Sequence, residues 1–470
     1  MIGNGTLREA CTTLAAFVLR LAPVTVLAGC ITLAKPPDTD ELAKNVLPDG
    51  APPPSQWTAG DAAGTVEAGW LATFADPELD ALVQEAIQHN ADLQAAAARV
   101  EQAAGYVAAV GGPRYPKVDL LGRGGSGLGD NTGLEGGLLS VSWELDVWGR
   151  VRYQVRGAKA TYGASASDFE YARQSLAALV AKSWFLATEA TLQRGVASDA
   201  VDSAAKLLDL AQERLRVGAG NELDVTTARL NLETYQDSLR QLDLSRVQAL
   251  RSLELLVGRY PAAALAAPPQ LGVLPPVAPA GLPSELLERR PDLLAAEQRV
   301  AAAFNLAREA KAARLPRFSL TASVSDLSSE FFVLKNRNNP VWSIGGTVFA
   351  PLFSGGTLRA QSEIRTAEQK EAMAHYVTTA LKAFGDVENA LSSEFALADR
   401  EKILTAAVSD AARALQLAET RYRVGSGDLR QVEQQQLAYQ STRMNLLRVQ
   451  SERRVQRVNL HLALGGGFAA

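Results

Sequence analysis

The sequence contains few cysteines, few aromatic residues and no excess of positive charge. Its two cysteines, Cys11 and Cys30, lie near the N-terminus, so the rest of the chain cannot form a disulfide or a cysteine-ligated metal site. Aromatic residues account for 6% of the chain, whereas alanine, whose small side chain lets helices approach one another closely, is very abundant. The formal net charge is −4, which gives no reason to expect a nucleic acid partner.

Proline is absent from two long stretches, residues 117–260 and 352–470. Proline breaks helix interiors, whereas alanine, which is abundant here, is the best helix former. Within the first stretch, glycine is also scarce from Arg150 to Arg216. A helix over those residues would be on the order of 100 Å long at about 1.5 Å per residue. The absences therefore predict very long helices.

The second half of the chain repeats the first. Four segments recur in the same order: NADLQAAAARV from Asn90 as RPDLLAAEQRV from Arg290, RYPKVDL from Arg114 as RLPRFSL from Arg314, WELDVWGR from Trp143 as FAPLFSGG from Phe349, and RVGAGNELDV from Arg216 as RVGSGDLRQV from Arg423. The offset is 200 for the first two pairs (290 − 90, 314 − 114), 206 for the third (349 − 143) and 207 for the fourth (423 − 216). Matches that keep their order indicate two homologous units.

Each unit begins with a helical region. In the first unit Asp76 is the expected N-cap and Pro77 the first helical residue, and the helix is expected to end near Gly111. In the second unit the region spans residues 283–314. There, Pro291 is expected to divide it into a short helix and a longer one.

Two segments with strand-like alternation follow in each unit. In FSLTASVS, residues 318–325, the even-numbered positions are apolar and the odd-numbered positions carry hydroxyl groups. A period of two is that of a strand with one apolar and one polar face. Its expected partner covers residues 341–349, and the first unit supplies residues 117–124 and 138–145 in the same places.

A long helix, a glycine turn and a return helix complete each unit. The helices are expected over residues 150–216 and 223–257 in the first unit, and over 357–423 and 429–464 in the second. Along the first return helix, apolar residues at spacings of three and four predict a packed seam: Val225, Ala228, Leu232, Tyr235, Leu239 and Leu242. The GAG and GSG turns lack the lysine and the third glycine of a phosphate-binding loop, so helix C-caps are the expected structures.

No set of catalytic residues is recognisable. The sequence has no HExxH, GxSxG or Walker motif. Its three histidines, His89, His375 and His461, are far apart in sequence and fall within helical patterns, so each is expected on the surface or in packing. We therefore expect no enzyme activity, no metal site and no cofactor.

The N-terminus is typical of an exported lipoprotein. Arg8 and Arg20 precede the apolar run LAPVTVLAGC, which ends at Cys30, and this pattern indicates a secretory signal peptide over residues 1–29. The run is too short to span a bilayer, and the alternative is the start of a buried strand or helix. LAGC resembles the lipobox of bacterial lipoproteins, which implies that acyl chains on Cys30 hold the protein to a membrane. Ile31 after the cysteine implies sorting to the outer membrane.

Strands with one apolar face must bury that face. In an exported, lipid-anchored chain a bilayer can cover it if the sheet closes into a barrel. Four short strands are too few to enclose a lumen, so several copies would have to combine. The long helices would continue the barrel as a tube, with the glycine turns at its far end. These observations predict a mainly α fold with duplicated halves, long coiled-coil hairpins, four strands per protomer and a shared membrane β-barrel.

The ordered motifs closely resemble those of the TolC-like outer-membrane factors, in particular the NodT-like lipoprotein branch that serves tripartite efflux pumps. The matching segments cover nearly the whole mature chain: LAGC, WLATFADPELDALV, NADLQ, WELDVWGR, RRPDLLAAEQRV, PLFSGG, the two RVGxG turns and the closing LALGGG. The resemblance implies a homotrimeric outer-membrane channel that continues as a helical tunnel through the periplasm. Small molecules would leave passively, an inner-membrane transporter would supply the energy, and a periplasmic adaptor would meet the tunnel tip.

The resemblance also implies roles for residues at the two turns. The adaptor-contacting tips are Val217, Gly218 and Gly220 in the first turn and Val424, Gly425 and Gly427 in the second. The possible pore gate lies just after the second turn and comprises Asp428, Gln431, Glu433 and Gln434. The family often places acidic residues there, whereas the matching positions of this chain hold Gln431 and Gln434, with Asp428 and Glu433 beside them. A ring of Asp428 carboxylates from the three copies would favour cations.

The expected division is a signal peptide (1–29), a lipidated N-terminal linker (30–75), a first repeat (76–260), a proline-rich linker (261–282) and a second repeat (283–470). The alternative from a different class is a lipid-anchored periplasmic coiled-coil adaptor, which usually carries one hairpin between β-rich domains. Two hairpins and alternating strands favour the channel. Drugs, metals and small metabolites all stay open as exported substrates.

Overall fold

The computed structural model describes residues 35–44, 46–47, 54–60, 64–66, 68–123, 135–328 and 341–468. The chain divides into two units, Met1–Pro36 and Pro37–Ala470, and every helix and strand named below belongs to the second unit. The expected signal peptide and Cys30 lie outside the described residues.

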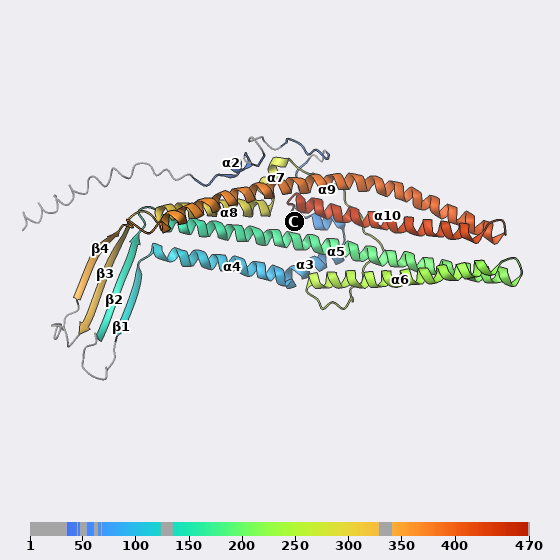
Figure 1. The fold of residues 1–470 in the computed structure, drawn as a ribbon, viewed down its shortest axis with the longest axis horizontal. Coiled ribbons are helices and arrows are strands. Elements are labelled where there is room, and N and C mark those ends of the chain that lie inside the picture. Colours follow the sequence, from blue (N-terminus) through green and yellow to red (C-terminus); the bar gives the residue numbers. More distant parts are fainter. Residues whose placement is uncertain are drawn as a thin grey trace, which may run out of the picture. The chain divides into compact units, whose positions relative to one another are not determined.

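The second unit contains one pattern of elements twice (Figure 1). After α2 (Thr39–Ala43) and the 3₁₀ helix η3 (Trp70–Phe74), the first copy comprises α3 (Pro77–His89), α4 (Ala91–Gly111), η4 (Gly112–Arg114), β1 (Lys117–Arg123), β2 (Glu135–Leu145), α5 (Arg150–Arg216) and α6 (Glu222–Val257). The second copy comprises α7 (Pro283–Arg289), α8 (Pro291–Ala312), β3 (Arg317–Ser328), β4 (Val341–Phe349), α9 (Thr357–Arg423) and α10 (Leu429–Ala463). Because α5 and α9 both have 67 residues and begin 207 residues apart (357 − 150), the duplication is confirmed.

The first helical region ends at Gly111 as expected, but it is divided at Asn90, a break that was not predicted from the sequence. Asn90 has an extended backbone between α3 and α4 and caps α4, since its side-chain oxygen accepts a hydrogen bond from the backbone N–H of Leu93 at 3.0 Å. The amide nitrogen of Asn90 also donates to the carbonyl of Leu256 at 3.0 Å. This tertiary bond fixes the break. In the second repeat, Pro291 separates α7 from α8 as predicted.

The expected start of α3 is confirmed, and it carries a long-range contact. The Asp76 carboxylate accepts hydrogen bonds from the backbone N–H groups of Glu78 and Leu79 at 3.1 Å each. Its second oxygen accepts from the indole Nε1 of Trp184 at 2.8 Å. The cap therefore ties α3 to the middle of α5.

The four strands form one antiparallel sheet in the order β1-β2-β3-β4. At its centre, β2 of the first repeat pairs with β3 of the second. Apolar residues face one another across this pair, as Val141 does Ala322, and hydroxyl residues do the same, as Ser140 does Ser323. The sheet therefore has the predicted apolar and polar faces. Its two edges are β1 and β4.

Strand pairing corrects one sequence alignment. Ser142 lies opposite Lys117, and Phe349 lies opposite Arg317. Lys117 and Arg317 begin equivalent strands at an offset of 200 (317 − 117), so Ser142 is the equivalent of Phe349, at an offset of 207 (349 − 142). The alignment of Trp143 with Phe349 was wrong by one residue. A slip of one residue moves a strand side chain to the opposite face, and only the sheet reveals the faces.

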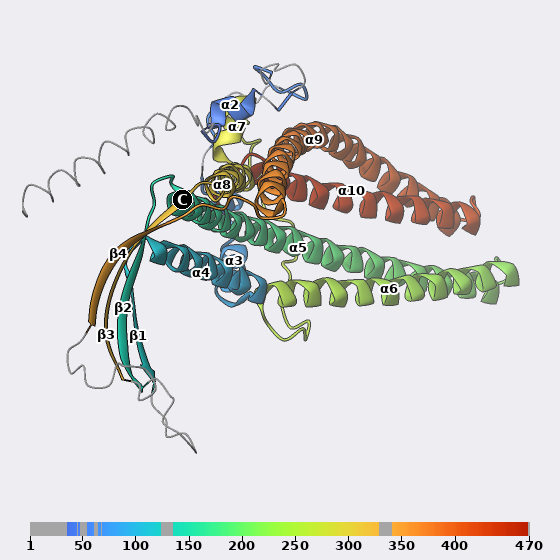
Figure 2. The same ribbon diagram turned by 60° about the vertical axis from the view of Figure 1, so that its left-hand side comes forward.

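The long helices pack as two antiparallel hairpins, α5 with α6 and α9 with α10, and α5 also contacts α8 and α10 (Figure 2). Two apolar clusters lie around the bases of the hairpins, one about α7, α8 and α9 and the other about α3, α5 and α6. A third joins both hairpins near the glycine turns. In the part of the chain that the structure describes, no helix is both long enough and apolar enough to cross a membrane.

Buried charged groups fix the linker between the repeats. The Glu254 carboxylate accepts hydrogen bonds from three consecutive backbone N–H groups, residues 263–265, at 2.6, 2.6 and 3.1 Å. In the second repeat, Arg457 donates to the carbonyl of Pro275 and to the Glu394 carboxylate, the latter at 2.6 Å. The linker is thus anchored in both hairpins.

Candidate functional site

The two glycine turns are helix C-caps, as predicted. Gly218 and Gly425 have φ angles of 74° and 81°, in the left-handed region that glycine tolerates without strain. The second glycine of each turn is required for a different reason. A Cβ on Gly220 would lie 2.9 Å from the backbone of the preceding helix, and one on Gly427 would lie 3.0 Å from a side-chain atom of that helix. The GxG pattern thus combines a positive φ with a close approach.

Each return helix begins with an equivalent side-chain cap (428 − 221 = 207). The side-chain oxygen of Asn221 accepts from the backbone N–H of Asp224 at 2.8 Å, and one carboxylate oxygen of Asp428 accepts from the backbone N–H of Gln431 at 2.8 Å. An N-cap of this kind stabilises a helix by about 1 kcal/mol. Asp428 therefore has a structural role in addition to any role in a gate.

Arg214 joins the two turns. Its Nη1 donates to the carbonyl of Tyr422 at 2.6 Å, and its Nη2 donates to the carbonyl of Ala219 at 3.1 Å. The guanidinium also lies over the Tyr422 ring, 4.7 Å from the centroid. Because Tyr422 is 1% exposed, the contact lies inside the pair of hairpin tips. This contact was not predicted, since it joins residues 208 positions apart and involves no recognised motif.

Just below the turns, the two hairpins share a small apolar core. It contains residues of all four long helices: Ala211, Val225, Ala228, Leu415, Ala418, Tyr422, Leu429 and Val432. Val225 and Ala228 belong to the predicted seam of α6, which is therefore confirmed as packing at this end. The two tips of one chain form a single packed unit.

Among the four possible gate residues, Glu433 differs from the rest. Three of the four are exposed: Asp428, Gln431 and Gln434. Glu433 is partly buried between the hairpins, where burial raises its pKa and repulsion from Asp224 raises it further, while a hydrogen bond with Asn231 acts in the opposite direction. Glu433 thus faces the other hairpin of its own chain.

The turns also expose apolar surface. Val217 and Val424 are both more than half exposed, although valine is usually buried. They occupy equivalent positions (424 − 217 = 207) next to the glycines. Each chain thus presents two valines at its tip.

The apolar face of the sheet is exposed near the N-terminal ends of α5 and α9, which are the ends away from the glycine turns. Large apolar side chains cover it on all four strands: Val118, Leu120, Leu139, Leu320, Trp342, Ile344 and Val348. A contiguous apolar surface of this kind marks contact with a membrane or another protein.

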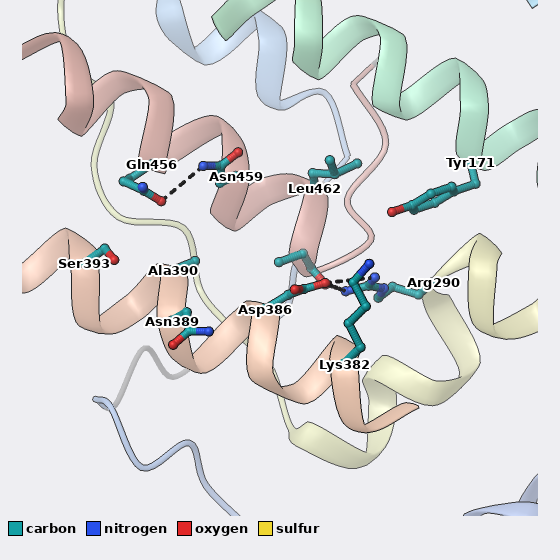
Figure 3. A pocket seen from close by; sticks show the side chains of 11 residues that line it. Tyr171, Arg290, Lys382, Asp386, Asn389, Ala390, Ser393, Gln456, Asn459 and Leu462 are labelled. Atoms are coloured by element: carbon teal, nitrogen blue, oxygen red, sulfur yellow. Dashed lines mark hydrogen bonds and ion pairs between the residues drawn. The ribbon is translucent and has the colours of Figure 1, made fainter. Parts of the chain in front are cut away.

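A polar cavity of about 350 Å³ lies where α5, α8, α9 and α10 meet (Figure 3). Arg290, at the start of α8, is almost fully buried there and donates to Asp292 at 2.7 Å, to Asp386 at 3.2 Å and to the carbonyl of Ala463 at 3.3 Å. These bonds connect the start of α8 with the end of α10. The cavity is therefore part of the junction between the second hairpin and the rest of the fold.

The three histidines are not brought together. His89 and His375 are exposed, whereas His461 is buried and stacks on Trp70 with ring centroids 5.7 Å apart. Burial, together with the nearby Arg457 charge, lowers the pKa of His461 to about 4. Over the residues that the structure covers, no group of three His, Cys, Asp or Glu side chains could hold a metal ion.

A family model described as outer membrane efflux protein matches residues 82–259 and 282–466. The first matched segment lies within the first repeat, and the second covers nearly all of the second repeat. Together they include both long hairpins and all four strands.

Known proteins are similar over nearly the full length. The Pseudomonas aeruginosa protein named pyoverdine export outer membrane protein OpmQ is 31% identical over 441 residues, which cover 90% of this chain and 93% of OpmQ. The Salmonella typhimurium protein named probable outer membrane lipoprotein SilC is 26% identical over 471 residues, covering 96% and 98%. A solved structure of the outer-membrane channel OprN has a TM-score of 0.80 at 26% identity, over 89% of this chain and 98% of the OprN chain.

Proposed function

The chain belongs to the outer membrane efflux protein family, and from this premise we propose that three copies assemble into one continuous conduit through the outer membrane and into the periplasm. The protein is the outer-membrane channel of a tripartite efflux system, and small molecules leave through it passively. This function replaces the alternative of a periplasmic adaptor. The known relatives of this chain are channel proteins and not enzymes.

The observation that carries the proposed assembly is the open four-stranded sheet joined directly to two helices of 67 residues. One face of the sheet is apolar and exposed, so a bilayer can cover it. Three copies would contribute twelve strands (3 × 4), enough to close a barrel around an aqueous lumen. The long helices would then extend the lumen as a tunnel.

The N-terminal part of the proposal is a lipid anchor. After removal of residues 1–29, acyl chains on Cys30 would insert into the inner leaflet of the outer membrane and tether the linker of residues 30–75 to it. The similarity to SilC, whose name describes a lipoprotein, supports this anchor. The two repeats, residues 76–260 and 283–470, are joined by the linker of residues 261–282 and would place their strands in the membrane and their helices on the periplasmic side.

The glycine turns are the proposed contact with a periplasmic adaptor, which links the channel to an inner-membrane transporter. The contact residues are those predicted from the sequence: Val217, Gly218, Gly220, Val424, Gly425 and Gly427. The exposed valines offer apolar anchors, and glycine lets a partner backbone approach closely. Because Arg214 and the shared apolar core hold the two tips together, an adaptor would meet them as one surface.

The pore gate is proposed at the start of α10. Asp428, Gln431 and Gln434 are exposed there, and three copies would place three Asp428 carboxylates around the tunnel entrance, which favours cations. Glu433 is better suited to controlling the separation of the two hairpins, because it lies between them beside Asp224.

The assembly can be tested by purifying the full-length protein from outer membranes in detergent and measuring the mass of the particle. We expect three chains per particle and incorporation of labelled palmitate that is lost in a Cys30→Ser variant. A monomer that is soluble without detergent would contradict the proposal.

A further inference from the structure

A basic cluster lies next to the sheet, on α5 and α8. Its exposed members are Arg156 and Lys159, near the start of α5, and Lys311, at the end of α8. α5 begins five residues after β2 ends (150 − 145), and α8 ends five residues before β3 begins (317 − 312). Because α5 and α8 pack against each other (Figure 2), the three cations lie on neighbouring helices close to the sheet.

A buried arginine completes the basic cluster. Arg308 of α8 is 8% exposed, and its guanidinium lies 5.5 Å from the centroid of the Tyr153 ring. The guanidinium of Arg156 lies 5.8 Å from the centroid of the same ring. Burial lowers the pKa of Arg308, Tyr153 acts in the opposite direction, and the charge of Arg156 lowers the pKa further. Two guanidinium groups therefore share one ring, and an anion beside them would offset their mutual repulsion.

The nearby carboxylates are paired with other residues. Glu144 and Glu309 contact Arg150 at 2.8 and 3.7 Å, and Asp146 contacts Arg152 at 3.1 Å. Within the described residues, no carboxylate forms an ion pair with any of the three exposed members of the basic cluster. The cluster thus presents positive charge that the chain itself does not neutralise.

On α5, the basic cluster lies on the side away from the proposed lumen. Glu144 shares the hydroxyl-bearing face of the sheet with Ser319, and this polar face would line the lumen once the apolar face is covered by lipid. The ion pair between Glu144 and Arg150 therefore marks the lumen side of α5. At about 100° per residue, Arg156 and Lys159 lie about 240° and 180° around the helix from Arg150. Both point to the outside.

On α8, the N-terminal linker marks the same outer side. The hydroxyl of Thr39 donates to the carboxylate of Glu297 at 3.1 Å. Glu297 and Lys311 are 14 residues apart, so they lie within about 40° of each other around α8. Thr39 follows the proposed lipidated residue, Cys30, by nine positions (39 − 30), a reach of about 30 Å. The linker to the acyl anchor thus starts on the side of α8 that carries Lys311.

The other repeat shows that the helices form without these charges. The equivalents of Arg156 and Lys159 in α9 are Glu363 (156 + 207) and Thr366 (159 + 207). The equivalents of Arg308 and Lys311 in α4 are Ala108 (308 − 200) and Gly111 (311 − 200). The basic cluster therefore occurs once per chain, and folding alone does not explain it.

We propose that the basic cluster binds the phosphate of an anionic phospholipid in the inner leaflet of the outer membrane. The inference rests on the proposed channel, whose barrel sets the level of the bilayer. Headgroups extend roughly 5–7 Å beyond each side of the hydrocarbon core. Arg156 lies about 9 Å along α5 from its first residue, and long basic side chains reach from such positions towards the headgroups.

The sheet explains why the ligand is a lipid and not a free anion. Leu320 and Val348 lie on the apolar face of the sheet, near the ends of β3 and β4 that adjoin the helices. They are 45% and 62% exposed, so acyl chains would lie against them while the phosphate contacts the basic cluster. Each basic residue at a membrane surface strengthens binding of an anionic lipid about fivefold, so three exposed cations distinguish anionic from zwitterionic headgroups.

Native mass spectrometry of the full-length protein in detergent tests the inference, because one spectrum gives both the number of chains and the number of bound lipids. Phosphatidylglycerol and phosphatidylcholine with the same acyl chains would be added at equal concentration. We expect trimers that retain up to three phosphatidylglycerol molecules, one per chain, at least tenfold in excess of phosphatidylcholine. Raising the salt concentration should reduce this excess.

The triple variant Arg156→Gln/Lys159→Gln/Lys311→Gln should lose the preference and retain at least tenfold less phosphatidylglycerol. Its matched control, Arg229→Gln/Arg251→Gln/Arg413→Gln, removes three exposed cations from α6 and α9 and should behave as the wild type. The double variant Lys159→Gln/Lys311→Gln keeps both guanidinium groups over Tyr153. It should lose most of the preference, and it decides the test if the triple variant yields no trimer.

Equal retention of phosphatidylglycerol by the basic-cluster variants and the control would overturn the inference, as would equal retention of both lipids by the wild type. Displacement of phosphatidylglycerol by millimolar inorganic phosphate would identify a site for a free anion and would also overturn it. Each of these outcomes leaves the proposed trimer intact. A particle of one chain would instead overturn the proposed assembly.

Discussion

The two helical hairpins have the same length but bury different chemistry. The first hairpin buries Leu250 and Ala187, whereas the equivalent residues of the second are Arg457 (250 + 207) and Glu394 (187 + 207). All four are at most 1% exposed. Arg457 donates to Glu394 at 2.6 Å and also to the carbonyl of Pro275 in the linker.

This difference shows that the residues needed to form a hairpin are distinct from those that attach the hairpin to the linker. The first repeat shows that apolar residues at these positions are sufficient for a hairpin of this length, in keeping with the finding that a buried ion pair is often no more stabilising than apolar residues of similar size. The ion pair of the second repeat has an added contact, the carbonyl of Pro275. We infer that it is retained because it fixes the linker that crosses between the repeats.

The largest effect is expected from removing one partner of this pair. Glu394→Ala leaves the guanidinium of Arg457 buried without a carboxylate and should destabilise the protein by about 3–5 kcal/mol, seen as a lower thermal midpoint of the detergent-solubilised particle. The double variant Glu394→Ala/Arg457→Leu gives the second hairpin the residues of the first. It should recover most of the loss, and a double variant no more stable than Glu394→Ala would contradict the comparison.

A second difference lies one turn along the return helix, where the first repeat has Glu254 and the second has the buried His461 (254 + 207). Burial and the charge of Arg457 lower the pKa of His461 to about 4 from an ordinary value of 6.5. The unfolded chain therefore takes up a proton before the folded chain does. The contribution of neutral His461 to the free energy of unfolding is on the order of 3 kcal/mol. This contribution is complete above pH 6.5 and is lost as the pH falls towards 4.

We expect the thermal midpoint of the wild type to decrease when the pH is lowered from 7 to 5, and we expect His461→Leu to reduce this pH dependence. Equal pH dependence in the two proteins would show that His461 is not responsible.

At the tips, replacing the equivalent residues Arg214 and Arg421 is expected to have different effects on conductance. Arg214→Ala removes two hydrogen bonds and the ring contact that join the two turns, with bonds to a charged group contributing about 1.5–3 kcal/mol each when buried, and less at this partly exposed site. The tips should separate more readily and single-channel conductance should rise. Arg421→Ala, at the equivalent position (214 + 207), is the matched control, because Arg421 is exposed. The same conductance in both variants would argue against Arg214 as the connection.

A smaller effect is expected within the turns. Gly218→Ala places a side chain at a φ of 74° with no atom within 4 Å of the new Cβ, so its cost is that of the left-handed backbone alone, about 1–2 kcal/mol. Limited proteolysis at the turn should accelerate. Gly195→Ala, within α5 and equally free of close atoms, should leave the cleavage rate unchanged or lower it.

The smallest effect on stability is expected at Asp428. Asn221 shows that asparagine caps the equivalent helix, so Asp428→Asn should keep the thermal midpoint while reducing cation selectivity in single-channel recordings. If selectivity were unchanged, the proposed ring of carboxylates would have no role in the gate.

Much of the fold could be predicted from the sequence, because long proline-free helices and alternating strands depend on local patterns. The ends of α5 and α9 and the division at Pro291 agree with prediction. The break at Asn90 was missed, although Asn90 aligns with Arg290, which precedes the predicted break at Pro291, and asparagine is a favoured N-cap. The register of β4 required the sheet itself, because an alignment error of one residue is invisible until strand faces are known.

The site was predictable in position but not in detail. The repeated glycines located both tips, and their C-cap role is confirmed. The contact of Arg214 with Tyr422 and the burial of Glu433 between the hairpins arise only when two segments about 200 residues apart pack together. Neither residue type indicates such a contact by itself.

The central claim is that three copies of this duplicated chain form a continuous channel. Recording currents across a planar bilayer after addition of the purified trimer tests it most directly. We predict stepwise ionic currents from single insertions, with lower cation selectivity in Asp428→Asn. A trimer that enters the bilayer and conducts no ions under any applied voltage would contradict the account.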